Sequence, residues 1–361
     1  MNKLLDKYIV QNFLIKWAAT LFSFIIIFLL VDIIDHLDHI MDSNMPSIAM
    51  LRYYYYSLPW YLSIGLPMSL LLATVFTMGI LQKNNELTAI KASGISVSRI
   101  SIPILILGIF FSIFSFFFEN LLVTNYLQKR NEIGIKYSLT KSKSKKIKKR
   151  NIFRQEASNK ILNIQRYNFR NKTAHNISIQ EFRDGKLARR LDALKMKWLP
   201  DDNHWLLSEY FIRSWESKTL KFYKSAEDSL LKLNFNPTDL TQATVKPEEM
   251  NYWELKEFVN KLNNYGIKDP RWSVNMLFKP AFACTSILMI LFGLSLSIRK
   301  PRTSLSVGIG VSIFVIFLYY TTIKTGQSLG YKGTLSPIVS VWLPNFIFFI
   351  TGIYLFTKTE T

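Results

Sequence analysis

The sequence predicts an α-helical membrane protein with six transmembrane helices, three before and three after an inserted extracytoplasmic all-β, jellyroll-like domain. Two observations predict this layout. Stretches of roughly 17 to 25 apolar residues, long enough to cross a hydrocarbon core of ~30 Å, lie near both ends of the chain. Residues 124–275 contain no comparable stretch. The composition agrees, because 49% of the 361 residues are hydrophobic and 14% are aromatic, more than a soluble chain of this length readily buries.

Each expected span has the length and composition of a membrane helix. The six spans are residues 13–31, 58–81, 100–118, 276–298, 303–323 and 335–357. No small-residue cleavage site follows the first span, so it is expected to remain in the protein rather than to be removed as a signal peptide. Two prolines in the second span and two in the sixth predict kinks, which membrane helices tolerate.

The distribution of Lys and Arg predicts the orientation. These residues gather in segments 3–16, 82–99, 299–302 and at residue 358, whereas the short segments on the other side hold Arg52, Lys324 and Lys332. Because cytoplasmic loops carry the excess of Lys and Arg, both termini are expected to be cytoplasmic and the large domain to lie outside. The expected boundaries are 1–123 for the first three spans, 124–248 for the outer domain, 249–270 for a linker helix and 271–361 for the last three spans.

The outer domain shows alternating runs separated by turn residues. Asp184-Gly185 lies between two such runs, which is a strong hairpin signal, and the spacing of the runs predicts an antiparallel sandwich or a partly open barrel. The segment "NYWELKEFVNKLNNYG" then carries a capping-box pattern at Asn251 and Glu254 and predicts a short helix. Asp269 and Pro270 are expected to cap and open the fourth span.

A polar stretch, "VDIIDHLDHIMD", follows the first span. On a helix Asp32, Asp35, His36 and His39 share one face, which is the pattern of either a metal or proton-transfer site or the polar end of a membrane helix. The apolar part that precedes it is about 28 Å long at 1.5 Å per residue, so Asp32 is expected at the outer boundary of the membrane. Since ligands on one helix seldom complete a coordination sphere, the polar end is favoured and no metal site is predicted.

The sequence lacks several common nucleotide-binding and catalytic motifs. No G-x-x-x-x-G-K-[ST] loop, G-x-S-x-G or H-E-x-x-H occurs, so no catalytic residue and no cofactor is predicted. The single cysteine, Cys284, excludes an internal disulfide. The net charge of +20 includes the run Lys141 to Arg150, which is either a contact for an anionic headgroup or phosphorylated sugar, or a solvated loop; no nucleic-acid partner is predicted.

A short amphipathic helix is expected between the second and third spans, at about residues 84–94. Good helix formers run from Asn85 to Ser93, with Leu87 and Ile90 as apolar positions and Gly94 as the terminator. Such a helix could lie on the lipid headgroups or press into a groove on a cytoplasmic partner.

This loop and its surroundings resemble the LptF/LptG family of lipopolysaccharide export permeases. The matching segments are "LDKYIVQNFL", "LPMSLLLATVFTMGILQKNNELTAIKASGIS", "LFGLSLSIRKPR" and "YYTTIKTGQSLGYKGTLSPIVSVWLPNFIFF", and "NELTAIKASG" is the most specific. The "LDKYI" start and Asp35 are closer to LptG, whereas "KPR" at residues 300–302 is closer to LptF. The resemblance covers nearly the whole chain.

The resemblance implies a non-catalytic subunit of an ABC transporter in the bacterial inner membrane. The family implies four partners: a paired six-span permease, a cytoplasmic dimeric ABC ATPase, a periplasmic bridge protein with a jellyroll fold, and lipopolysaccharide as the substrate. The short inner helix would be the coupling helix that binds the ATPase through Glu86, Leu87, Ala89, Ile90, Ala92, Ser93 and Gly94.

The lipid cavity that the family implies is expected to have a polar rim. The residues expected there are Asp32, Asp35 and Lys324. Some members place basic residues at the outer end of the first span, where this chain has Asp32 and Asp35. Two other functions remain open from the residues alone: an intramembrane enzyme that uses the Asp/His stretch, and a membrane-tethered scaffold whose outer domain binds partners.

Overall fold

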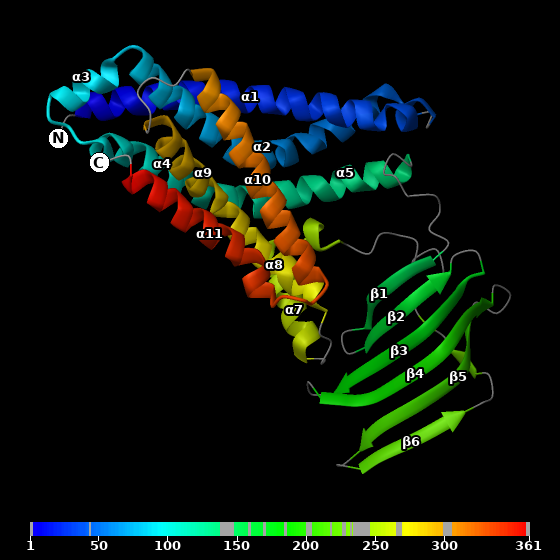
Figure 1. Cartoon of the computed structure of the whole chain (residues 1–361). Helices are drawn as coiled ribbons and strands as arrows, with labels where there is room; N and C mark the ends of the chain where they lie inside the picture. The colour runs from blue at the N-terminus through cyan, green and yellow to red at the C-terminus, as the bar shows by residue number, and fades with distance from the viewer. Residues whose placement is uncertain are drawn as a thin grey trace. The chain divides into compact units, whose positions relative to one another are not determined.

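The chain forms two compact units, a helical one and a β one (Figure 1). The helical unit comprises Met1–Thr140, Pro247–Val259 and Asp269–Thr361, and the β unit comprises Lys141–Lys246 and Asn260–Lys268. The computed structural model describes residues 3–42, 45–137, 148–157, 160–168, 171–183, 186–199, 204–216, 219–225, 229–231, 233, 246–264, 269–298 and 305–358.

Long apolar helices make up most of the helical unit. They are α1 (Lys3–Asp42), α2 (Ser47–Lys83), α4 (Val97–Phe118), α8 (Pro270–Ala283), α9 (Thr285–Ile298), α10 (Leu305–Tyr331) and α11 (Pro337–Thr357). The shorter elements are α3 (Glu86–Ala92), η1 (Glu119–Val123), α5 (Thr124–Lys136), η2 (Pro247–Glu249) and α7 (Tyr252–Asn264), whose last residues belong to the β unit. In the described part of the chain five helices are long and apolar enough to cross a membrane, or six if α8 and α9 form one broken span.

The fourth expected span is not one straight helix. It divides into α8 and α9, which are bent by 41° at a break next to Cys284. Pro280 lies inside α8 just before the break. Proline lacks an N–H and its ring clashes with the carbonyl four residues earlier, so its effect falls on residues 276–280 and not on the break at Cys284, whose N–H donates to the Pro280 carbonyl. By contrast, α2 continues as one helix through Pro59 and Pro67, and α11 through Pro344.

The third expected span continues far beyond its predicted end. A five-residue π-helical segment, η1, follows α4 directly, and α5 then extends the same helix to Lys136. The expected start of the outer domain at residue 124 is therefore wrong as a description of the fold, because Thr124–Lys136 is helical and belongs to the helical unit. The hydropathy scan missed this extension because its residues are mostly polar.

The two largest apolar clusters among the described residues of the helical unit hold its helices together. One joins α1, α2, α3, α4 and α9 and includes the fully buried Ile9 and Phe13. The other joins α2, α9, α10 and α11 around Tyr319 and Phe348. Helices α10 and α11 approach closely where Gly326 and Gly330 face Ser340, and a Cβ at either glycine would overlap with atoms of Ser340. Small residues spaced by four let membrane helices pack at such short separation.

The β unit is a seven-stranded antiparallel sheet. The strands are β1 (Lys148–Ala157), β2 (Lys160–Asn168), β3 (Thr173–Arg183), β4 (Lys186–Leu199), β5 (His204–Glu216), β6 (Thr219–Ser225) and β7 (Ser229–Leu231). Strands β1 to β6 pair in the order of the sequence, and β7 also pairs with β5. This order is a meander, and the described strands do not show the crossover connections of a jellyroll or a second sheet packed on the first.

The sequence predicts alternating strands in this region with a hairpin at Asp184-Gly185, and strands β3 and β4 flank that turn. Arg183 pairs with Lys186 across the predicted hairpin, while Asp184 and Gly185 lie outside the described residues, as do residues 141–147 of the basic run. A buried cluster that includes Leu162, Tyr167, Met196, Trp198 and Trp205 covers one face of the sheet. Burial raises the pKa of the Tyr167 phenol to about 12.

The segment that follows the β unit is hydrogen-bonded to η1 and α5, the helical segments that precede the β unit. Gln128 on α5 donates to the backbone oxygen of Glu249 at 2.7 Å, and Asn131 donates to the Glu249 carboxylate at 2.8 Å. The Tyr252 N–H, at the start of α7, donates to the side chain of Asn120 at 2.8 Å. The predicted capping box is also confirmed, since Asn251 and Glu254 exchange hydrogen bonds between side chain and backbone.

Candidate functional site

The loop that joins α2 to α4 is built around the short helix α3, as the sequence predicts. Asn85 precedes the helix with a φ of 60°, a left-handed conformation that asparagine tolerates better than most residues. Gly94 ends it with a φ of 83°. The Gly94 N–H donates to the Lys91 carbonyl and the Ile95 N–H to the Ile90 carbonyl, which is a Schellman motif. The sequence "NNELTAIKASG" therefore specifies both ends of the helix.

One face of α3 is buried against other helices of the chain, and the other face is exposed. Leu87 is only 3% exposed and lies in the apolar cluster with residues of α1, α2 and α4, while Ile90 packs partly against it. The exposed residues of the loop include most of those expected to bind the ATPase, namely Ala89, Ala92, Ser93 and Gly94. Leu87 is a correction to that expected set, because a side chain buried in its own chain offers no surface to another protein.

The first turns of α1 contact both ends of this loop. The Tyr8 hydroxyl donates to Oε2 of Glu86 at 2.7 Å, and the Asn84 amide donates to Oε1 of the same carboxylate at 3.2 Å. At the other end of the loop, Arg99 in the first turn of α4 forms an ion pair with Asp6 at 2.7 Å. The carboxylate of Glu86 is thus held between α1 and the end of α2.

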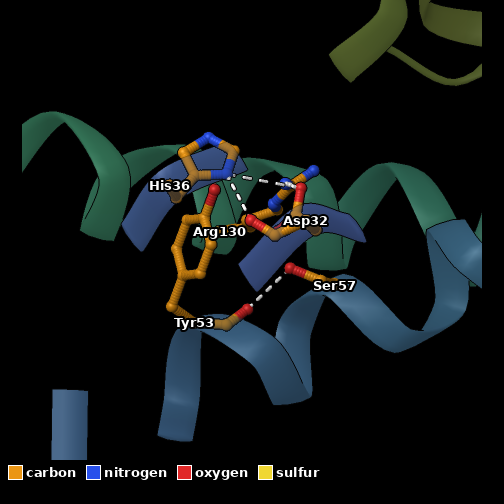
Figure 2. A network of polar contacts seen from close by, with 5 residues as sticks. All are labelled: Asp32, His36, Tyr53, Ser57 and Arg130. Atoms are coloured by element: carbon orange, nitrogen blue, oxygen red, sulfur yellow. Dashed lines mark hydrogen bonds and ion pairs between the residues drawn. The ribbon is translucent and has the colours of Figure 1, made fainter. Parts of the chain in front are cut away.

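A second polar site lies where α1, α2 and α5 meet (Figure 2). Asp32 on α1 forms an ion pair with Arg130 on α5, with 3.1 Å between Oδ1 and Nη2, and the two side chains are 13% and 11% exposed. His36 donates from Nδ1 to the Asp32 backbone oxygen at 2.8 Å and lies 3.6 Å from the Asp32 carboxylate. Asp32 therefore meets a cation from another helix.

Aromatic rings of α2 surround the guanidinium of Arg130. It lies 5.0 Å from the centre of the Tyr53 ring and 5.4 Å from that of Trp60. Tyr53 is buried, and its backbone oxygen accepts a hydrogen bond from Ser57 at 2.8 Å (Figure 2). Stacking against aromatic faces suits arginine because its charge is delocalised over a plane.

The structure separates the other residues expected at the lipid rim from this pair. Asp35 is exposed, and the side chain of His39 lies outside the described residues. Lys324 donates to Gln327 at 3.0 Å and lies over the Phe278 ring, in a second cluster that includes Asn275 and Tyr331. Among the described residues no group of three His, Cys, Asp or Glu side chains could hold a metal ion.

Arg130 is the functional candidate that sequence reasoning missed. It lies in a polar segment that was assigned to the outer domain, so nothing suggested that it would face α1. Glu119, the first residue of η1, accepts a hydrogen bond from Ser63 of α2 at 2.6 Å. A helical signal in residues 124–136, which combine good helix formers with few turn residues, could have revealed the extension.

Comparison with known proteins identifies the family. The family model described as "Lipopolysaccharide export system permease LptF/LptG" matches residues 7–358. The chain belongs to this family. Two curated relatives, both named "Lipopolysaccharide export system permease protein LptG", come from Escherichia coli K12 and from E. coli O6:H1 strain CFT073. Each is 22% identical over 368 residues, and the alignment covers 98% of both chains.

Family membership agrees with the architecture. The LptF/LptG model covers both groups of apolar helices and the β unit between them. Together with the long apolar helices, it identifies a multi-pass inner-membrane permease of the lipopolysaccharide export system. The fold class predicted from the sequence is confirmed to this extent, as a helical membrane protein with an antiparallel β region.

Proposed function

We propose that this chain is one of two paired six-span permeases that extract lipopolysaccharide from the inner membrane, driven by a separate dimeric ABC ATPase. The observation that carries the proposal is helix α3, which is anchored by Leu87 and presents small exposed residues between α2 and α4. A helix with a small-residue face can enter a groove on a partner closely. ATP hydrolysis then takes place in the partner, and this chain is non-catalytic.

The proposed orientation places α3 and both termini in the cytoplasm. Lys and Arg are concentrated in the segments at that end, as the positive-inside rule requires. The opposite ends of α1 and α2, together with α5, then face the periplasm, where the β unit would pass the lipid to a periplasmic bridge protein. The names of the two relatives favour the LptG branch of the family.

The Asp32–Arg130 pair changes the expected polar rim. Because Arg130 neutralises Asp32, the acidic character of the rim falls mainly on Asp35, which is exposed. Lys324 is proposed to contribute a cation from α10. The alternative of an intramembrane enzyme loses one of its candidate residues, since the Asp32 carboxylate is already bound to Arg130. The alternative of a scaffold predicts no ATP-dependent lipid movement.

The proposal is tested with the full chain reconstituted in vesicles with a paired permease, the ATPase and lipopolysaccharide. We expect Glu86→Ala to lower the amount of lipid released per ATP hydrolysed, because it removes the carboxylate of α3. Thr88→Ala is the matched control, since Thr88 is an exposed neighbour on the same short helix. An absence of ATP-dependent release with the unmodified chain would refute the transport function. Unchanged coupling in Glu86→Ala would refute the role of Glu86.

A further inference from the structure

The Glu86 carboxylate is held by two donors from different elements. Oε2 accepts from the Tyr8 hydroxyl at 2.7 Å, and Oε1 accepts from the Asn84 amide at 3.2 Å. Tyr8 and Glu86 are 78 positions apart in the sequence, so the first contact joins separate helices. A glutamate side chain on a protein surface normally samples several rotamers. These two bonds restrict Glu86 to one orientation.

Tyr8 is attached to a rigid part of the molecule. Its neighbours Ile9 and Phe13 are fully buried in the cluster that also contains Leu87 of α3. The Tyr8 side chain itself is 43% exposed, so its ring adds little to the core. Its hydroxyl, which reaches a charged acceptor, is the part that makes a specific contact.

The geometry leaves Glu86 able to receive a further cation. A carboxylate has about four lone-pair sites, of which the two observed donors use one on each oxygen. The other sites remain available to an arginine or lysine of a partner protein. Fixing the rotamer before binding removes the entropy cost of ordering the side chain at the interface, so a pre-oriented carboxylate binds a cation more tightly than a mobile one.

We propose that Tyr8 is a positioning residue, which orients Glu86 for a cationic group of the ATPase. This inference rests on the proposed function, because it assumes that α3 meets an ATPase. The ion pair between Asp6 and Arg99 supports the same arrangement by fixing the opposite end of the loop to the first turn of α1. In this proposal the first turns of α1 influence the ATPase indirectly, because they position the loop that contains α3.

The decisive experiment is a double-mutant cycle of Tyr8→Phe and Glu86→Gln in the reconstituted transporter. Tyr8→Phe removes only the hydroxyl, and we expect about a tenfold fall in lipid released per ATP, the lower end of the range for one lost hydrogen bond to a charged group. In the Glu86→Gln background Tyr8→Phe should add little further loss, because both changes disrupt one interaction. Thr351→Val is the control, since it removes a hydroxyl that donates within its own helix, α11.

The outcomes separate this inference from the proposed function. If Glu86→Gln lowers coupling but Tyr8→Phe does not, or if the two losses multiply independently, the positioning role of Tyr8 is wrong and the transport function stands. If the unmodified chain releases no lipid with ATP, the proposed function fails first. In that case the spin-label measurement described next still decides whether Tyr8 orders this loop.

A second measurement needs no partner. A nitroxide label is placed at Ala92→Cys, which is exposed on α3, in a full chain in which the single native cysteine is replaced by Cys284→Ala. We expect Tyr8→Phe to broaden the range of label motion in vesicles, and Thr351→Val to leave the spectrum unchanged. An unchanged spectrum in Tyr8→Phe would show that the hydroxyl does not order the loop.

Discussion

Arg130 on α5 and Asp32 on α1 form a mostly buried ion pair between residues 98 positions apart. Through it the helix that leads to the β unit is joined to the end of the first membrane helix. The same helix, α5, also holds Glu249 of the returning chain through Gln128 and Asn131. One helix therefore contacts both the other helices and the connection to the β unit, and this arrangement makes several testable predictions.

Breaking the Asp32–Arg130 pair should destabilise the helical unit. Arg130→Ala leaves a mostly buried carboxylate without its cation, and we expect a loss of about 2 to 3 kcal/mol, below the value for a fully buried pair. Arg130→Lys should recover only part of this loss, because lysine cannot stack as a plane between Tyr53 and Trp60. Thermal unfolding of the purified chain in detergent measures the effect. Arg52→Ala, at an exposed arginine of α2, is the control and should be nearly neutral.

Gly326→Ala should disturb the packing of α10 on α11. The new methyl group would overlap with the Ser340 carbonyl, and backbone atoms cannot rotate away, so we expect a loss of at least about 2 kcal/mol. Gly310→Ala is the matched control on the same helix, because nothing lies within 4 Å of its Cβ position. The midpoints of thermal unfolding of the two variants give the comparison. Equal midpoints would contradict the close approach of the two helices.

Gly94→Ala should weaken binding of the ATPase without lowering the stability of the whole chain. The φ of 83° strains any residue with a Cβ by about 1 kcal/mol, which corresponds to about a fivefold loss of affinity if binding requires the ordered loop. Nothing lies within 4 Å of the Cβ position, so strain is the cause. Gly94→Asn should bind at least as well as Gly94→Ala, because asparagine tolerates this conformation. If only the larger Asn weakened binding, the cause would be steric.

Asn131→Ala should loosen the connection to the β unit. Glu249 loses a hydrogen bond to its carboxylate, and we expect amide exchange in residues 247–252 to become about tenfold faster, as for the loss of one buried hydrogen bond. Hydrogen–deuterium exchange followed by mass spectrometry measures this rate. Asn125→Ala is the control, since its amide donates to Leu121 within the same helix. Equal rates in the two variants would show that Asn131 does not hold the connection.

Local sequence signals predicted the parts of the fold that depend on local physics. The two ends of α3 follow from Asn85 and Gly94, and the start of α7 from Asn251 and Glu254, because capping depends on residues within one turn. Strands β2 to β6 follow from alternation and turn residues. The apolar helices were recognised because the hydrocarbon core fixes their length.

Local sequence signals could not predict contacts between distant segments. Nothing in the residues around Asp32 indicates that its partner is Arg130, since the pairing depends on how far α5 extends and which way it faces. The burial of Leu87 likewise depends on α1 and α4. The sequence pattern correctly predicted that α3 is a helix, but periodicity alone could not tell which of its apolar residues face the chain's own core.

The π-helical segment η1 fixes the length of the chain between α4 and α5. Its Thr124 N–H donates to the Glu119 carbonyl, five residues back, so this turn holds one residue more than an α-helical turn. The turn already accommodates its extra residue, so inserting one more residue here would rotate all of α5 by about 100° relative to α4. Arg130 would then turn away from Asp32, and Gln128 and Asn131 away from Glu249. Substitutions in η1 are therefore expected to be far better tolerated than a single-residue insertion.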